Sequence, residues 1–140
     1  ITKDSETPED IAVPTYVKED LDNVVCGYHL ALIRADETQI LSEYLFRVFQ
    51  SKKINSHFNI RATGVTRVGL SLGDISGVYI PFPKSKEEQA QIVSHIKTET
   101  AKIDQAIAKA QKEIELIKEY REAMIAEAVL GKFNHNIVKS

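Results

Sequence analysis

Cysteine is almost absent from this sequence, which has one among its 140 residues. The chain therefore forms no internal disulfide, and its four histidines do not stand with the cysteine at zinc-site spacing. Cys26 lies in the apolar stretch NVVCGYHLALI, so we expect a buried thiol in a reducing cytoplasm. The same stretch is predicted to form a strand. His29 lies three residues after Cys26, so the two side chains face opposite sides of that strand. We therefore predict a core histidine there, and no nucleophile–base pair.

Long hydrophobic runs are missing as well. No stretch approaches the roughly 18 consecutive apolar residues that a transmembrane helix needs. No basic segment followed by an apolar run opens the sequence, so no signal peptide is expected. Because the sequence begins at Ile1 and not at methionine, we expect a fragment or a processed product.

The motifs of common catalytic sites are also missing. Gly131-Lys132 is the only Gly-Lys pair, and it lacks the first glycine and the hydroxyl residue of a phosphate-binding loop. No two glycines are spaced G-x-G, as a dinucleotide or methyl-donor loop requires. No proline lies in the Asp/Asn-Pro-Pro-aromatic motif of amino-methyltransferases. We predict a non-catalytic chain without a cofactor or a metal site.

Proline and glycine are absent from Ser85 to Leu130, directly after the stretch IPFP. The sequence Ser85-Lys86-Glu87-Glu88 has the order of a capping box, which starts a helix. Gly131 stands where a left-handed C-cap would end it. The sequence therefore predicts one helix of about 45 residues, roughly 65–70 Å long.

Apolar residues recur three and four positions apart along this helix, as in the a/d seam of a coiled coil. Thr100 and Arg121 interrupt the seam, and the apolar surface widens between Ile114 and Val129. A coiled coil is favoured over a helix folded back on its own domain, because the repeat continues over five heptads. The predicted interface residues are Val93, Ile96, Ile103, Ile107, Ala110, Ile114, Ile117 and Met124.

Shorter elements are expected before the long helix, so the predicted fold class is α+β. Periodicity and turn residues give their order. They are a helical turn after Thr7, a buried strand over Val24–Ile33, a helix over Ile40–Phe49, a second helix over Ser51–Ala62, a helical turn at Leu72–Ile75 and a closing strand over Val78–Phe82.

Acidic residues are missing from the middle of the chain. Residues 44–73 carry five bases and no acid, whereas residues 1–23 carry seven acids and two bases. Lysine and arginine bind phosphates, and arginine can read guanine edges. The stretch RATGVTR places two arginines around a turn that could enter a groove. The candidate DNA contacts are Lys52, Lys53, Arg61, Thr66 and Arg67; the alternative is a solubilising surface, on which we also expect His57.

An ordered series of stretches resembles the specificity subunit of type I restriction–modification systems. It comprises SETPEDIAV, NVVCGYHLALIR, GVTRVGLSLGDISGVYIPFP, EEQAQIV and LIKEYREAMIAEAVLGK. A full subunit of that family has two target-recognition domains, each followed by a long helix. The two helices pack antiparallel as a spacer, and each domain reads one half of a split DNA sequence. The chain resembles the C-terminal part of one such domain with one spacer helix.

The resemblance implies a domain organisation and a set of partners. Residues 1–83 would form part of a small mixed α/β target-recognition domain, residues 84–131 the spacer helix of an antiparallel coiled coil, and residues 132–140 a tail. The partners would be double-stranded DNA, the methyltransferase and nuclease subunits of the same system, and a second copy of the chain. Two alternatives are a dimerisation scaffold without DNA affinity and the recognition tail of a single-chain restriction–methylation enzyme.

Overall fold

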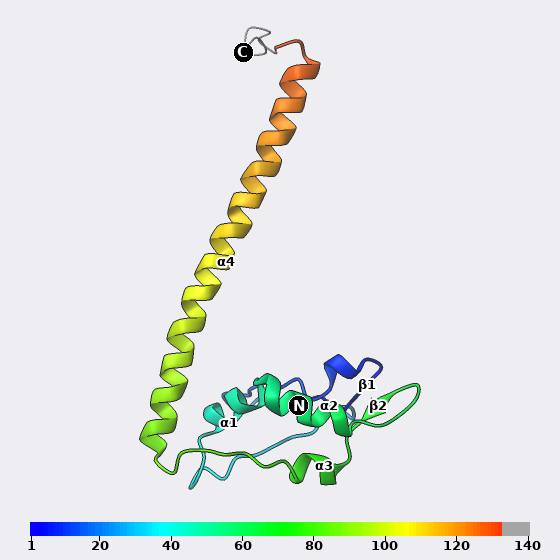
Figure 1. Cartoon of the computed structure of the whole chain (residues 1–140), viewed down its shortest axis with the longest axis vertical. Helices are drawn as coiled ribbons and strands as arrows, with labels where there is room; N and C mark the ends of the chain where they lie inside the picture. Colours follow the sequence, from blue (N-terminus) through cyan, green and yellow to red (C-terminus); the bar gives the residue numbers. More distant parts are fainter. Residues whose placement is uncertain (133–140) are drawn as a thin grey trace. The chain divides into compact units, whose positions relative to one another are not determined.

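The structure is a computed structural model and describes residues 1–132. It divides into two compact units, Ile1–His95 and a second that begins at Ile96. Nearly all of the predicted tail over 132–140 lies outside the described residues. Helices and a two-stranded antiparallel sheet both occur, which confirms a mixed α and β fold (Figure 1). The elements are β1 (Asp4–Ser5), the 3-10 helix η1 (Pro8–Asp10), α1 (Ser42–Phe49), α2 (Lys52–Arg61), β2 (Val68–Gly69), α3 (Leu72–Ser76) and α4 (Lys86–Val129).

The three short α-helices lie where the sequence predicts them. At the start of α1, the Ser42 amide donates to the Glu37 carboxylate at 2.9 Å. The Ser51 hydroxyl caps α2 by accepting from the Ile54 amide at 3.4 Å. Ser71 and Asp74 form a reciprocal capping box at the start of α3. Side chains thus satisfy backbone amides that the first helical turn leaves without partners.

The sheet joins the N-terminus to a segment about 64 residues later. Asp4 pairs with Gly69 and Ser5 pairs with Val68. Two isolated bridges extend this pairing, Thr2 with Leu30 and Thr63 with Gly69. The sheet is short, but it brings three distant segments of the chain together.

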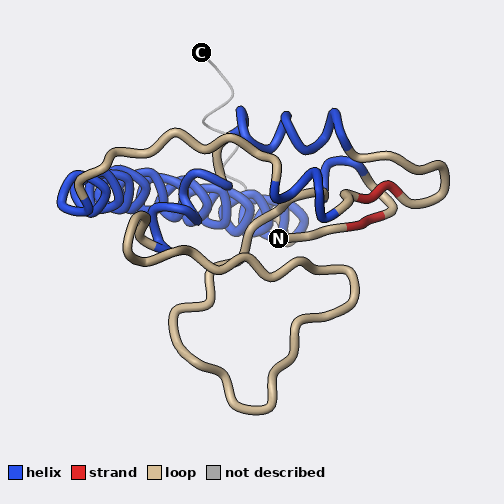
Figure 2. The backbone as a smooth tube through the Cα atoms, turned by 90° about the horizontal axis from the view of Figure 1, so that it is seen from below, coloured by secondary structure: helices blue, strands red, loops and turns tan. Residues whose placement is uncertain are grey.

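The two strands predicted from the apolar runs are wrong. Val24–Ile33 is irregular and most of its residues are exposed, including Cys26, which we expected to be buried. It belongs to the long coil between η1 and α1, which forms a wide open loop (Figure 2). A strand needs a paired neighbour, and among the described residues only the N-terminal segment pairs with this run, near Leu30.

The second of these strands, over Val78–Phe82, is also irregular in the structure. Pro81 and Pro83 flank Phe82 and have no amide hydrogens to donate. No strand among the described residues pairs with this run. The segment therefore connects α3 to α4 without joining the sheet.

The core of the first unit is small. Five buried residues form it: Ile11, Ala12, Phe49, Phe58 and Leu70. The rings of Phe49 from α1 and Phe58 from α2 stack with their centroids 5.7 Å apart. The N-terminal coil, both helices and the segment after β2 are thus held on one apolar cluster.

The two ends of α4 follow the sequence signals closely. The Ser85 hydroxyl accepts from the Glu88 amide at 3.2 Å, as a capping box requires, and donates to the Glu87 carboxylate at 2.8 Å. At the other end Gly131 has φ of 70°. The Lys132 amide donates to the Glu127 carbonyl and the Gly131 amide to the Ala128 carbonyl, which is a Schellman motif.

Beyond the first unit, the seam of α4 has no covering partner among the described residues. Ile103, Ile107 and Ile114 are about half exposed, at 57%, 50% and 52%. The Thr100 hydroxyl donates to the Ile96 carbonyl at 2.8 Å, so this polar interruption is satisfied within its own helix. The long helix is confirmed, whereas the coiled coil remains a prediction. Within residues 1–132, no helix is long and apolar enough to cross a membrane.

Candidate nucleic-acid interface

Three of the five predicted contact residues lie on α2. Lys52 and Lys53 are its first two residues, and Arg61 is its last. All three side chains are exposed, while Phe58 and Ile54 of the same helix turn toward the core. The helix therefore presents basic side chains to solvent at both of its ends.

The bases of α2 are only weakly compensated within the first unit, where the charge of Arg61 is one of several causes that lower the pKa of Asp74. Among the described residues, no ion pair engages Lys52, Lys53 or Arg61. The Arg61 guanidinium instead donates to the His57 carbonyl at 3.3 Å. It also lies 3.1 Å from Nδ1 of the His57 ring. Two lysines in the first turn oppose the helix dipole, at a typical cost of about 0.3–1 kcal/mol each. Helix stability therefore does not account for them.

The other two predicted residues, Thr66 and Arg67, lie on the loop between α2 and β2. We call residues 63–69 the hairpin loop, because a backbone pair closes it. The Thr63 amide donates to the Gly69 carbonyl at 3.1 Å, and the Gly69 amide donates back at 3.0 Å. Thr66 is exposed on this loop. The five predicted residues thus follow one another along α2 and the loop that leaves it.

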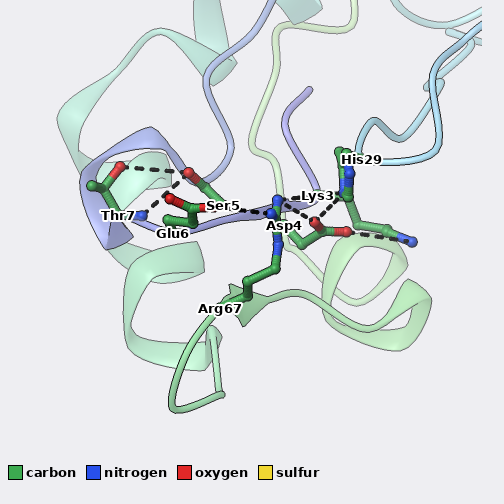
Figure 3. Close-up of polar contacts among 7 residues, drawn as sticks. All are labelled: Lys3, Asp4, Ser5, Glu6, Thr7, His29 and Arg67. Carbon is green, nitrogen blue, oxygen red and sulfur yellow. Dashed lines mark hydrogen bonds and ion pairs between the residues drawn. The ribbon is translucent and has the colours of Figure 1, made fainter.

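Arg67 differs from the bases of α2, because acids surround it. Its guanidinium lies 3.1 Å from the Asp4 carboxylate and 3.5 Å from that of Glu6 (Figure 3). The Asp4 side chain is only 18% exposed. The stretch 44–73 contains no acidic residue, but acids from the N-terminal segment lie beside Arg67 in the structure. The free positive charge is concentrated on α2.

His29 joins the same cluster, so it is not the core histidine that the sequence suggested. Its side chain is 53% exposed, and Nδ1 lies 2.5 Å from the Asp4 carboxylate. Partial burial raises the pKa of Asp4, but hydrogen bonds and charges from His29 and Arg67 lower it by more. The pKa of Asp4 therefore lies below its usual value, and the carboxylate stays charged beside Arg67.

Sequence reasoning missed this cluster because its members are far apart in the chain. Asp4 precedes Arg67 by 63 positions, and His29 precedes it by 38. No local spacing connects them, and only the pairing of β1 with β2 brings Asp4 to the hairpin loop. The one available signal was the concentration of acids in residues 1–23, opposite in sign to the basic middle of the chain.

Comparison with known proteins identifies a family. A family model described as the type I restriction modification DNA specificity domain matches residues 12–116. Comparisons with curated proteins and with solved structures gave no match. The matched range includes α2, the hairpin loop and the first part of α4, whereas Asp4 and Glu6 lie outside it.

Proposed function

Because the chain belongs to the type I restriction modification DNA specificity domain family, we propose that it is a non-catalytic module that binds one half of a split DNA sequence. Residues 1–83 carry the recognition role in this proposal, and residues 84–131 form a spacer helix. The methyl transfer and cleavage chemistry belongs to the methyltransferase and nuclease subunits with which the chain assembles.

The observation that carries the proposal is the exposed positive surface of α2, where Lys52, Lys53 and Arg61 form no ion pair with a described residue. Lys52 and Lys53 stand at the helix N-terminus, where backbone amides and the helix dipole also favour an anion. A DNA phosphate placed there would gain from both lysines and from the dipole. Binding would release counterions and depend steeply on salt.

We assign two roles to α4 in this proposal. Its exposed seam pairs with the α4 of a second copy, and a two-fold axis perpendicular to the helices would relate the two copies of an antiparallel pair. Such a pair would separate two recognition units by a set distance and offer docking surfaces to the methyltransferase subunits. The length of α4, 44 residues or about 66 Å, supports a spacer.

The exposed seam also supports the alternative of a dimerisation scaffold without DNA affinity of its own. The single-chain restriction–methylation enzyme is a further alternative, and the same interface of α2 would serve it. DNA binding separates the first alternative from the proposal, because a scaffold does not need the lysines of α2.

The test is charge reversal on α2 in the chain assembled with its methyltransferase subunit. Lys52→Glu and Lys53→Glu should each weaken binding to duplex DNA about equally for all sequences. Each lost phosphate contact should also flatten the plot of log affinity against log salt concentration by about one unit. Binding is measured by titrating labelled duplexes at several salt concentrations.

Lys112→Glu is the matched control, because Lys112 is an exposed lysine of α4 that lies off the predicted seam. It makes the same change in net charge and should leave affinity and salt dependence as they are. If both α2 reversals behave like the control, the DNA surface lies elsewhere. If the wild-type assembly binds no duplex DNA, the scaffold alternative is favoured.

A further inference from the structure

The hairpin loop has a shape that its own backbone determines. The Thr63–Gly69 pair closes it at the base, as described above. Gly64 has φ of 147°, and a Cβ placed there would lie 1.8 Å from the Arg67 carbonyl oxygen. Only glycine fits that position, because no other residue lacks the Cβ. The loop is thus a tight turn whose backbone requires glycine at position 64.

One side of the loop is held to the N-terminal segment. The Arg67 guanidinium is paired with Asp4 and Glu6, and Asp4 also accepts a hydrogen bond from His29. Asp4 is at the same time a strand residue, paired through its backbone with Gly69 at the base of the loop. Arg67 therefore connects the loop to a partly buried carboxylate, and a phosphate would have to compete with that carboxylate for the guanidinium.

The tip of the loop is free. Val65 is fully exposed, and Gly64 and Thr66 beside it are exposed as well. The loop starts two residues after Arg61, the last basic residue of α2, and Figure 1 shows it reaching past β1 and β2. An exposed valine beside a threonine offers an apolar group and a hydroxyl. These are groups that contact the thymine methyl and the polar edges of bases.

We propose that Val65 and Thr66 contact bases at the tip of the hairpin loop, and that Arg67 positions this loop without contacting phosphate. The inference rests on the proposed function, because it needs α2 bound to the phosphates of the same DNA. It divides the candidate residues into two kinds: Lys52, Lys53 and Arg61 supply affinity, and the loop supplies sequence preference.

The first experiment changes the tip. The wild-type chain, assembled with its methyltransferase subunit, selects its preferred sites from duplexes with randomised sequence. Val65→Ala should relax the preference at one base pair and lower affinity for the selected site by about fivefold, the low end for one mismatched pair. The salt dependence should stay unchanged, because no phosphate contact is lost.

Val25→Ala is the matched control, since Val25 is also a strongly exposed valine on a loop of the first unit. Neither change removes packing, so both variants should fold. The inference is overturned if Val65→Ala leaves the selected sequence unchanged. It is also overturned if that variant keeps its sequence preference but no longer assembles with the methyltransferase subunit. The tip would then be a protein contact.

The second experiment changes the holding contact through Asp4→Asn. If Arg67 positions the loop, this variant should bind the selected site more weakly and blur the preference, as Arg67→Gln should also do. The double variant should be no worse than either single one, because both remove the same contact. Arg67→Lys keeps a positive charge beside the Asp4 carboxylate, so it should recover part of the sequence preference.

The opposite result identifies Arg67 as a phosphate contact. Asp4→Asn would then strengthen binding by releasing the guanidinium, and Arg67→Gln would flatten the salt dependence by about one unit. Either observation overturns the positioning role. The proposed function is judged separately by Lys52→Glu and Lys53→Glu, so salt-dependent DNA binding without any effect of the loop variants contradicts only this inference.

Discussion

At the scale of single residues, the fully buried Gln89 is the most informative side chain outside the interface. Its carbonyl oxygen accepts from the Leu41 amide at 2.8 Å. Its amide donates to the Gln39 carbonyl at 3.0 Å and to the Pro83 carbonyl at 2.7 Å. A buried polar group is tolerated when such bonds satisfy it. Gln89 therefore joins the first turns of α4 to the start of α1 within the first unit.

Gln89→Leu should destabilise the first unit. Leucine has a similar volume and suits a helix, but it would leave the Leu41 amide and two carbonyls without these partners. We expect a loss of about 1–3 kcal/mol in the free energy of unfolding. Urea unfolding followed by circular dichroism measures the loss, and hydrogen exchange at the Leu41 amide should become faster.

The control for this change is Gln91→Leu, on an exposed position two residues further along α4. It should have little effect on unfolding. Equal stability of the two variants, with the Leu41 amide still protected, would mean that Gln89 fills space and holds nothing.

At the scale of elements, the short helices depend on side chains that accept hydrogen bonds from backbone amides. In α3, the Ser71 hydroxyl and the Ser71 amide both donate to the Asp74 carboxylate, and this lowers the pKa of Asp74 below its usual value. Hydrogen bonds from Ser42 lower the pKa of Glu37 at the start of α1 in the same way. The folded state therefore prefers these groups ionised.

The contribution of Asp74 to stability should disappear in acid. Since its pKa is lower in the folded state, the contribution is complete above the unfolded value of about 4 and is lost as pH falls through the folded value. Asp74→Asn should thus be less stable than the wild type at pH 7, and the difference should shrink as pH falls below about 4. Urea unfolding at a series of pH values measures it.

Asp104→Asn, on the exposed surface of α4, is the control for the loss of one carboxylate. A difference between wild type and Asp74→Asn that stays constant down to pH 2 would show that Asp74 acts through shape and not through its charge.

At the scale of the whole molecule, the second unit leaves a large apolar surface uncovered. Its exposed residues on α4 include Ile103, Ile107, Ile114, Leu116, Ile117, Tyr120, Ile125 and Val129. Many exposed apolar side chains on one helix are typical of an interaction site. The heptad spacing agrees with a helical partner, and the absence of one within the described residues leads to the proposed homodimer.

Ile107→Asp should dissociate that dimer. The position lies near the middle of the seam, and a buried carboxylate without a partner costs several kcal/mol, roughly 2–7 for an uncharged polar group and more for a charge. Light scattering at tens of micromolar should give the mass of a dimer for the wild type and of a monomer for the variant.

Gln105→Asp places the same carboxylate two positions before Ile107, about 200° around α4 and so on the side opposite the seam, and should leave the dimer intact. A wild-type chain that is monomeric under these conditions contradicts the proposed pairing. A variant that stays dimeric places the interface away from Ile107.

The sequence by itself determined the helices, because their signals are local. Ser51, Ser71 and Ser85 cap α2, α3 and α4, and a lack of proline and glycine lets α4 continue until Gly131 ends it. Each of these signals acts within four residues of its partner, so spacing along the chain was sufficient. The basic residues of α2 were visible in the same way.

Only the tertiary structure decided which residues meet across long separations. The run Val24–Ile33 has the composition of a buried strand, but a strand forms only where another segment supplies its hydrogen bonds. Arg67 has the side chain and the basic sequence neighbourhood of a phosphate contact. The pairing of β1 with β2, however, brings Asp4 beside it. Helix hydrogen bonds lie within one segment, whereas strand pairs and ion pairs need two, and spacing along the chain does not show which two will meet.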